Sequence, residues 1–167
     1  MPLLLPVLVR GINNLSDARY CAGMGADGLI FTLDLSLPGA VTPALVKELA
    51  GWVSGVELIG EFGEMPAAAV NQLVAECALS RVLLTPETAE VSAEFAVPVL
   101  RTAPYAATLP AATYAGRWVS GLFGPADVAR LLVGQPAGLL LRGGDEIKPG
   151  LRDFTELEAI FEALEAE

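Results

Sequence analysis

The sequence predicts an α/β fold in which about seven parallel strands, most of them followed by a helix, close into a barrel. Short apolar runs alternate with segments of helical periodicity along nearly the whole chain, and the links between them are short. Successive strand–helix units with short links give parallel strands and right-handed crossovers. The apolar runs also lack alternation with polar residues, which is typical of strands that are buried on both faces. A closed barrel buries its strands in this way better than an open sheet with exposed edges.

Five strands and four helices are expected before residue 102. Asn14, Thr42 with Pro43, and Pro66 are typical first residues for the helices that follow the first three strands. A shorter helix is expected near residues 87–95. The five strands are expected at residues 5–10, 28–33, 55–62, 81–84 and 97–101.

The regular alternation ends at residue 103. Residues 103–116 carry no charge and two prolines, and no strand is predicted there. Two further strands, at 117–122 and 138–141, each precede a helix. A complete strand–helix unit needs about 30 residues, so the uncharged stretch is too short to hold one. The sequence therefore predicts one domain, residues 1–167, folded as a TIM-type (β/α) barrel that is shortened by about one βα unit and is closed or partly open.

Composition excludes several classes of partner. Hydrophobic residues make up 53% of the chain and charged residues only 18%, which favours doubly buried strands and a surface for self-association. The net charge of −10 argues against nucleic acid or an anionic membrane as a partner, because both need a basic surface. The apolar segment at residues 1–10 is too short for a membrane span and lacks the basic start of a signal peptide. We therefore expect a cytoplasmic protein.

The residues that usually carry metal or acid–base chemistry are scarce. The chain has no histidine, which removes the usual base near neutral pH and the commonest metal ligand. Its two cysteines, Cys21 and Cys77, lie in separate helical segments without metal-binding spacing, and each is expected to pack in the core. No metal site and no cofactor are predicted.

The turn after the last strand is a candidate anion site. The strand ends at Arg142, Gly143 and Gly144, and a helix follows. Free backbone N–H groups at such a turn, with a helix dipole behind them, can hold a phosphate. The same residues also suit a tight turn without a ligand, and the turn alone does not separate these two interpretations.

Several segments resemble the phosphoribosylanthranilate isomerases. Residues 7–18 (VLVRGINNLSDA) resemble the family's opening, roughly V-K-I-C-G-I-T-x-x-E-D-A, and residues 144–153 (GDEIKPGLRD) resemble its closing G-V-E-x-x-P-G-x-K-D. Shorter similarities lie at residues 25–31, 41–43, 58–62 and 121–128. The resemblance implies a TIM-type barrel and an aldose–ketose isomerase of tryptophan biosynthesis. It also implies a cysteine base on the first strand, an aspartate acid on the sixth, and a substrate phosphate held by backbone amides after the last two strands.

The catalytic pair that the resemblance implies is missing. Arg10 stands where the family has its cysteine, and a guanidinium cannot act as a base because it stays protonated. The strand that carries the family's aspartate would fall in residues 103–116, which hold no carboxylate. The fallback candidates for an acid and a base are Asp34, Glu61 and Glu57.

The resemblance also places Arg10 at the barrel mouth, where a partly buried guanidinium needs a carboxylate or a bound anion. Arg101 and Arg142 each end a strand, so the three arginines are expected on one rim. They could form an anion pocket or a set of internal salt bridges, and the nearby carboxylates favour the salt bridges. The carboxylates expected nearest to Arg10 are Asp34, Glu57 and Glu61.

The phosphate-holding positions of the family fall on small residues here. They are Ser120, Gly121, Gly143 and Gly144, with Arg142 in place of a family serine. Small residues let the backbone approach a phosphate, so phosphate binding remains an expectation. Asp145 lies beside them and would repel an anion.

Three functions are compatible with these features. The first is a non-catalytic barrel that binds a phosphosugar or a protein partner. The second is an isomerase that acts on a sugar phosphate with carboxylates as acid and base. The third is a genuine phosphoribosylanthranilate isomerase whose missing groups come from a partner chain. Loss of the catalytic pair favours the first.

The missing unit leaves two ways to complete the ring. Either seven strands close a tighter barrel, or a seam opens between the fifth strand and the next and exposes backbone groups. Residues 103–116 or a second chain would then cover the seam. We expect a homodimer in which this stretch is buried.

Overall fold

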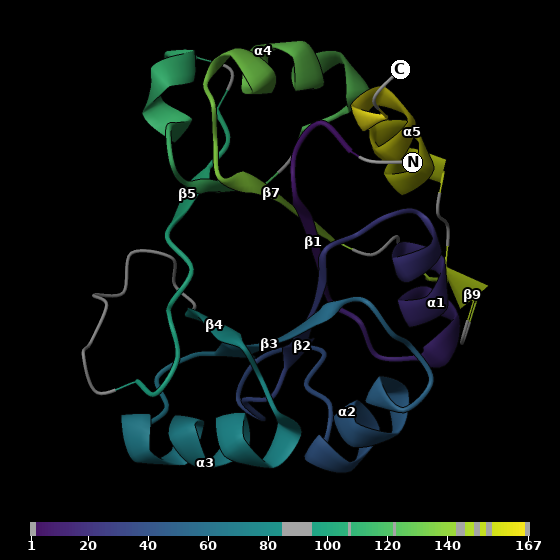
Figure 1. Cartoon of the computed structure of the whole chain (residues 1–167), viewed down its shortest axis with the longest axis vertical. Helices are drawn as coiled ribbons and strands as arrows, with labels where there is room; N and C mark the ends of the chain where they lie inside the picture. Colours follow the sequence, from purple (N-terminus) through teal and green to yellow (C-terminus); the bar gives the residue numbers. More distant parts are fainter. Residues whose placement is uncertain are drawn as a thin grey trace.

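The strands form one parallel sheet that curls into a ring with the helices on its outside (Figure 1). The computed structural model describes residues 3–84, 95–106, 108–121, 123–142, 146–148, 151–152 and 155–165. The sheet has seven strands in the order β4-β3-β2-β1-β7-β6-β5. This confirms the predicted TIM-type barrel. The strands are β1 (Val7–Arg10), β2 (Gly28–Thr32), β3 (Glu57–Phe62), β4 (Arg81–Leu84), β5 (Thr102–Pro104), β6 (Trp118–Ser120) and β7 (Gly138–Arg142).

The helices begin where the sequence predicts. The Asn14 side chain accepts a hydrogen bond of 2.9 Å from Asp17 N, and the Thr42 hydroxyl accepts one of 3.2 Å from Leu45 N, with Pro43 as the first helical residue. The helix expected near residues 87–95 falls almost wholly outside the described residues. The α-helices are α1 (Leu15–Gly23), α2 (Pro43–Ala50), α3 (Ala67–Cys77), α4 (Val128–Val133) and α5 (Thr155–Leu164).

Three short elements add to this pattern. A 3₁₀ turn, η2 (Pro125–Asp127), leads into α4. Between β7 and α5 the chain forms a small antiparallel pair, β8 (Glu146–Lys148) and β9 (Leu151–Arg152), that the sequence did not predict. The third, the 3₁₀ turn η1 (Ala111–Tyr114), lies between β5 and β6.

One strand serves two neighbours and so closes the ring. Two backbone hydrogen bonds, of 3.0 and 2.9 Å, join residues 98–100 to Val82 of β4. The next residues pair with β6 instead, beginning with a 2.8 Å bond from Trp118 N to the Arg101 carbonyl. The strand predicted at 97–101 therefore lies a few residues later, as β5. The alternative of a seam between this strand and the next is wrong, because β5 and β6 pair directly. The contact with β4 on the other side is shorter and consists of one isolated bridge, between Val82 and Val99.

Residues 103–116 connect β5 to β6 in place of a longer strand–helix unit. They were expected to hold no strand, yet they supply two residues of β5 and the 3₁₀ turn η1 (Ala111–Tyr114). Tyr114 is fully buried, and its hydroxyl donates to the Ala106 carbonyl (2.9 Å) and accepts from Ala106 N (2.8 Å). Its own aromatic side chain thus anchors this stretch.

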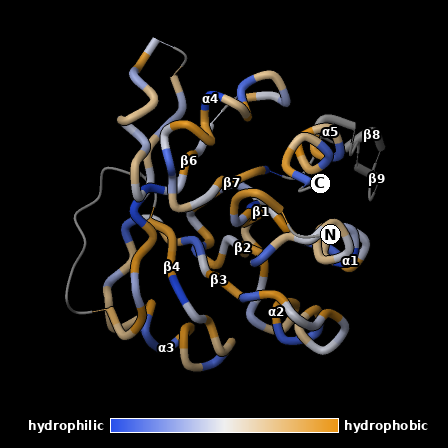
Figure 2. Tube along the Cα trace, turned by 45° about the horizontal axis from the view of Figure 1, so that its top comes forward, coloured by the Kyte–Doolittle hydropathy of each residue, from blue (hydrophilic) through white to orange (hydrophobic). Residues whose placement is uncertain are grey.

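Two apolar layers pack against the two faces of the sheet. The larger lies between the strands and the helices, and Figure 2 shows hydrophobic residues along β1 and β7. The smaller fills the inside of the ring and consists of Leu8, Ile30, Ile59, Leu83, Leu100, Trp118 and Leu140. We call this set the inner cluster. Because side chains alternate along each strand, the members of this cluster identify which other strand residues face the inside of the ring.

The two cysteines pack in the outer layer, as expected. Cys21 and Cys77 are both buried and unpaired with each other. Burial raises the pKa of the Cys21 thiol to about 12 and raises that of Cys77 as well, so both stay protonated near neutral pH. No helix in the described part of the chain is long and apolar enough to cross a bilayer.

Candidate functional site at the barrel mouth

The carboxyl ends of the strands form the end of the barrel that we call the mouth. Parallel barrels carry their chemistry at this end. Polar residues follow members of the inner cluster by two positions on five strands, so strand alternation turns them toward the inside of the ring. They are Arg10, Thr32, Glu61, Ser120 and Arg142.

An ion pair between Arg10 and Glu61 occupies one side of the mouth. Arg10 Nη2 donates to Glu61 Oε2 at 2.7 Å, and Arg10 Nε donates to Glu61 Oε1 at 3.3 Å. The two side chains are only 14% and 8% exposed. Arg10 ends β1 and Glu61 lies on β3, so the pair reaches across β2. Of the three carboxylates expected near Arg10, Glu61 is the one that pairs with it.

Asp34 is a structural carboxylate in this arrangement. It is 6% exposed, and it accepts hydrogen bonds from the Ser36 hydroxyl (2.6 Å), Ser36 N (2.9 Å) and Gly63 N (2.9 Å). The Ser36 hydroxyl and N–H hold the pKa of Asp34 below its usual range, and Gly63 N adds to the effect. Asp34 thereby ties the loop after β2 to the end of β3. Both of its oxygens are occupied, which disfavours a role as acid or base.

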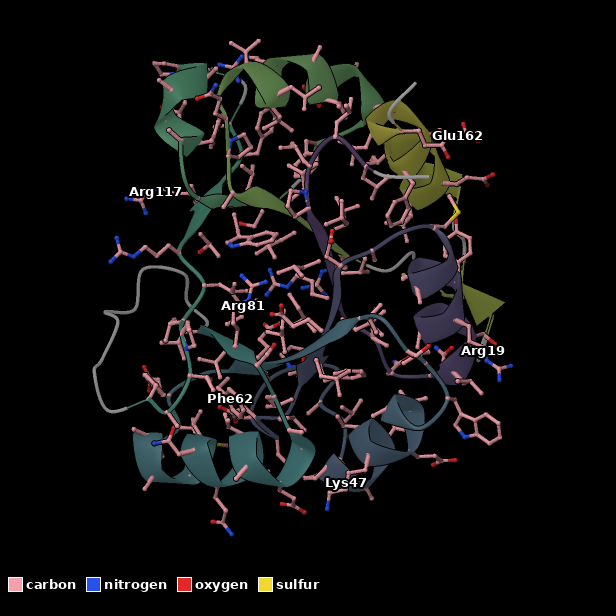
Figure 3. The ribbon with its side chains drawn as sticks, viewed as in Figure 1. Arg19, Lys47, Phe62, Arg81, Arg117 and Glu162 are labelled. Atoms are coloured by element: carbon pink, nitrogen blue, oxygen red, sulfur yellow. The ribbon has the colours of Figure 1, made fainter. Side chains whose placement is uncertain are left out.

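Glu57 lies at the opposite end of the barrel, so the expectation that it lines the mouth is wrong. It is the first residue of β3, and its carboxylate pairs with Arg81, the first residue of β4, through Arg81 Nε and through Nη2 at 3.1 Å. Figure 3 shows Arg81 inside the ring of strands. Its guanidinium carbon lies 5.1 Å from the centre of a Trp118 ring. Glu57 and Glu61 lie on the same strand but at opposite ends of the barrel, because Glu57 begins β3 and Glu61 lies near its end.

Arg101 is not on the rim either. Leu100 belongs to the inner cluster, so the next residue along the strand faces outward, and Arg101 is exposed there. The expectation of three arginines around one rim is therefore corrected to two, Arg10 and Arg142. These two are paired in register on neighbouring strands.

The other side of the mouth holds the expected phosphate positions. Ser120 is buried (2% exposed), and its carbonyl accepts a 2.7 Å bond from Tyr105 N. Gly121 follows with φ +105°, a conformation that favours glycine. Gly143 and Gly144 lie outside the described residues, as does Asp145. Of the residues predicted to hold a phosphate, Ser120 and Gly121 therefore lie together at the end of β6, and phosphate binding by them stays a prediction.

A tyrosine–aspartate contact that sequence reasoning missed supports this side. The Tyr105 hydroxyl donates to Asp127 Oδ1 at 2.8 Å, and Gly124 N donates to Asp127 Oδ2 at 2.8 Å. The Gly124 N–H and the Tyr105 hydroxyl hold the pKa of Asp127 below its usual range, and the bond to Asp127 raises the pKa of Tyr105. The contact joins the loops after β5 and β6. Nothing in either local motif indicates that the two residues meet.

Comparison with known proteins agrees with this geometry. No family model matches the chain. Over 90 residues it is 33% identical to the N-(5'-phosphoribosyl)anthranilate isomerase of Pelobacter propionicus, a match that spans 52% of this chain and 42% of that protein. The phosphoribosyl anthranilate isomerase of Thermus thermophilus superimposes with a TM-score of 0.73 at 25% identity, covering 96% of this chain and 98% of that one.

The chain is similar to the phosphoribosylanthranilate isomerases, in sequence over about half of its length and in fold over nearly all of it. Two further isomerase structures share the fold at lower identity, and the match to each covers 96% of this chain and 98% of that chain. One is a complex with reduced 1-(o-carboxyphenylamino)-1-deoxyribulose 5-phosphate (TM-score 0.77, 16% identity). The other shows monomers of the dimeric isomerase from Thermotoga maritima (TM-score 0.75, 18% identity). The sequence match spans under half of the curated isomerase, whereas the fold matches over nearly the whole chain. The comparisons therefore establish the shared fold.

Proposed function

We propose that this chain is a non-catalytic barrel of the phosphoribosylanthranilate isomerase type, which binds a phosphorylated small molecule at its mouth. The Arg10–Glu61 ion pair carries this proposal. Arg10 stands at the position that resembles the family's catalytic cysteine, and its guanidinium remains protonated at any working pH. Both oxygens of Glu61 accept hydrogen bonds from Arg10, so the nearest carboxylate is engaged as well.

An isomerase with rebuilt chemistry is the second candidate. It would use Asp34 or Glu61 as acid and base in place of the family's cysteine and aspartate. The hydrogen bonds that hold Asp34 to Ser36 and Gly63, and the ion pair of Glu61, count against this role. Glu57 is a weaker candidate still, because it lies at the amino end of the strands.

A genuine tryptophan-biosynthesis isomerase is the third candidate, and its support is the match to the Pelobacter enzyme. Complementation separates it from the non-catalytic proposal. The gene would be expressed in a tryptophan auxotroph that lacks the isomerase, beside a known isomerase as a positive control. We expect no growth with this chain. Growth without tryptophan would show that the mouth retains the isomerase reaction.

Ligand binding is tested with a molecule that a relative is known to hold. Reduced 1-(o-carboxyphenylamino)-1-deoxyribulose 5-phosphate is bound by a phosphoribosyl anthranilate isomerase of the same fold, and it carries both a phosphate and a carboxylate. We expect saturable heat on titration into the full chain. Absence of saturation at millimolar concentration would remove the phosphosugar part of the proposal.

We also propose that the protein is cytoplasmic and forms a homodimer that buries residues 103–116. Tyr114 covers part of this stretch within one chain, whereas Leu109 is 40% exposed and is available to a second copy. A relative in Thermotoga is dimeric. Sedimentation is expected to show a dimer whose stretch resists protease. A monodisperse monomer that is cut readily within residues 103–116 would exclude this assembly.

A further inference from the structure

Three arginines face the inside of the ring, and two of them are paired with a glutamate. Arg10 pairs with Glu61 at the mouth, and Arg81 pairs with Glu57 at the amino end. The third is Arg142, which ends β7 and is exposed. Among the residues that the structure describes, none forms an ion pair or hydrogen bond with Arg142. Inside the described ring, this leaves one cation without a carboxylate.

The position of Arg142 directs it toward the mouth. Leu140 belongs to the inner cluster, and Arg142 follows it by two residues on the same strand. Arg142 is also paired in register with Arg10 on the neighbouring strand. Beside it, Gly11 has φ +79°, and a Cβ there would lie 4.0 Å from Arg142 Cγ. The stem of Arg142 therefore passes next to a residue without a side chain, and the Arg142 side chain is exposed.

The charges around this position favour an anion. Two guanidinium groups on adjacent strand ends repel each other unless negative charge lies nearby. Glu61 supplies that charge to Arg10, and the hydrogen bonds of Asp34 direct its carboxylate to Ser36 and Gly63. The protein as a whole carries a net charge of −10, so a local cation would favour an anionic ligand against the overall negative charge.

We infer that Arg142 is the anion-binding side chain of the mouth, and that its guanidinium binds the oxyanion of a small molecule, either a phosphate ester or a carboxylate. The planar fork of N–H donors suits two oxygens of either group. This inference rests on the proposed function, because it names the group that would hold the small molecule. It goes further in assigning recognition to a side chain rather than to backbone amides alone.

The test compares two arginines that differ in position. Wild type, R142Q and R101Q would be titrated calorimetrically with ribose 5-phosphate and, separately, with benzoate. Arg101 is the matched control, because it is also exposed at a strand of the ring but faces outward. Thermal unfolding of each variant would verify that it is folded.

We expect wild type to bind at least one probe saturably, and the probe that binds identifies the ligand class. R142Q should weaken that binding about tenfold or more, which corresponds to loss of a charge-assisted hydrogen bond, and R101Q should leave it unchanged. R142K should retain part of the affinity, since it keeps the charge and loses the fork. Equal affinity in R142Q and wild type would overturn the inference. So would an equal loss in R101Q, or no saturation by either probe.

These outcomes are distinct from those that test the proposed function. Growth of the auxotroph would overturn the non-catalytic proposal, whereas dependence of probe binding on Arg142 would still stand. Conversely, absence of growth together with unchanged binding in R142Q would overturn only the assignment of Arg142.

Discussion

The two ends of this barrel each hold an arginine–glutamate pair inside the ring, and the two pairs differ in their surroundings. At the amino end, Glu57 and Arg81 join neighbouring strands, are 28% and 26% exposed, and lie against the Trp118 ring. At the mouth, Arg10 and Glu61 reach across an intervening strand and are 14% and 8% exposed. The amino-end pair therefore helps to fill the barrel. The pair at the mouth lies where this fold places its chemistry, so the same two residue types have a different meaning there.

The largest expected effect is at the amino end, on replacing Trp118 with alanine. Trp118 is 8% exposed within the inner cluster, and its ring packs closely on Gly138. W118A should lower the free energy of unfolding by about 3–5 kcal/mol, because it removes a large buried ring and leaves a cavity. Urea unfolding measures this change. W52A is the matched control, since Trp52 is 60% exposed and its loss should cost less than about 1 kcal/mol. Equal losses would mean that the inner cluster does not support the ring.

The comparison of the two ion pairs is tested directly by E61A and E57A. E61A leaves Arg10 without this carboxylate in a nearly buried position, which should lower the free energy of unfolding by about 3 kcal/mol. E57A acts on a more exposed pair and should lower it by about 1 kcal/mol. Both are measured by urea unfolding under the same conditions. A larger loss for E57A would reverse the distinction drawn between the two ends.

How far the sequence predicts this fold depends on which half of the chain is considered. The first four strands and the helices after the first three follow from local signals, such as the caps at Asn14 and Thr42 and the apolar runs between them. The pairing of the strand at residues 98–104 does not follow from local signals. Its side-chain pattern is the same whether its backbone pairs with β4 or with β6. Which neighbour it pairs with is decided by ring closure, which is a property of the whole sheet.

The site shows the same limit. Resemblance places Arg10 at the mouth, but three carboxylates were equal candidates for its partner. Strand position excludes Glu57, local hydrogen bonds engage Asp34, and only Glu61 remains within reach. Arg101 was misplaced because Leu100 faces the inside of the ring, so strand alternation turns Arg101 outward, and its position at a strand end does not reveal this.

Replacing both members of the pair at the mouth should have a smaller effect than replacing one. R10M/E61L exchanges two charges for apolar side chains of similar size, and such exchanges of buried pairs are close to neutral. We expect the double variant to lie within about 1 kcal/mol of wild type in urea unfolding, well above E61A. A double variant as unstable as E61A would show that Arg10 or Glu61 has a further essential contact. That outcome would mean that Arg10 and Glu61 stabilise the mouth by more than their contact with each other.

The smallest expected effect is the acid dependence of Asp34, which ties the loop after β2 to β3 at the mouth. Hydrogen bonds from Ser36 and Gly63 lower its pKa in the folded state. A carboxylate with a lowered folded pKa stabilises the fold above its unfolded value of about 3.9, and this contribution is lost as the pH falls below that value toward the folded pKa. At pH 7, D34N should therefore lower Tm by about 2–4 °C, because its amide faces backbone donors. The difference from wild type should shrink as the pH falls below about 3. E48Q, at an exposed glutamate of α2, should show no such convergence. A gap for D34N that persists unchanged into acid would mean that Asp34 acts through packing and not through its charge.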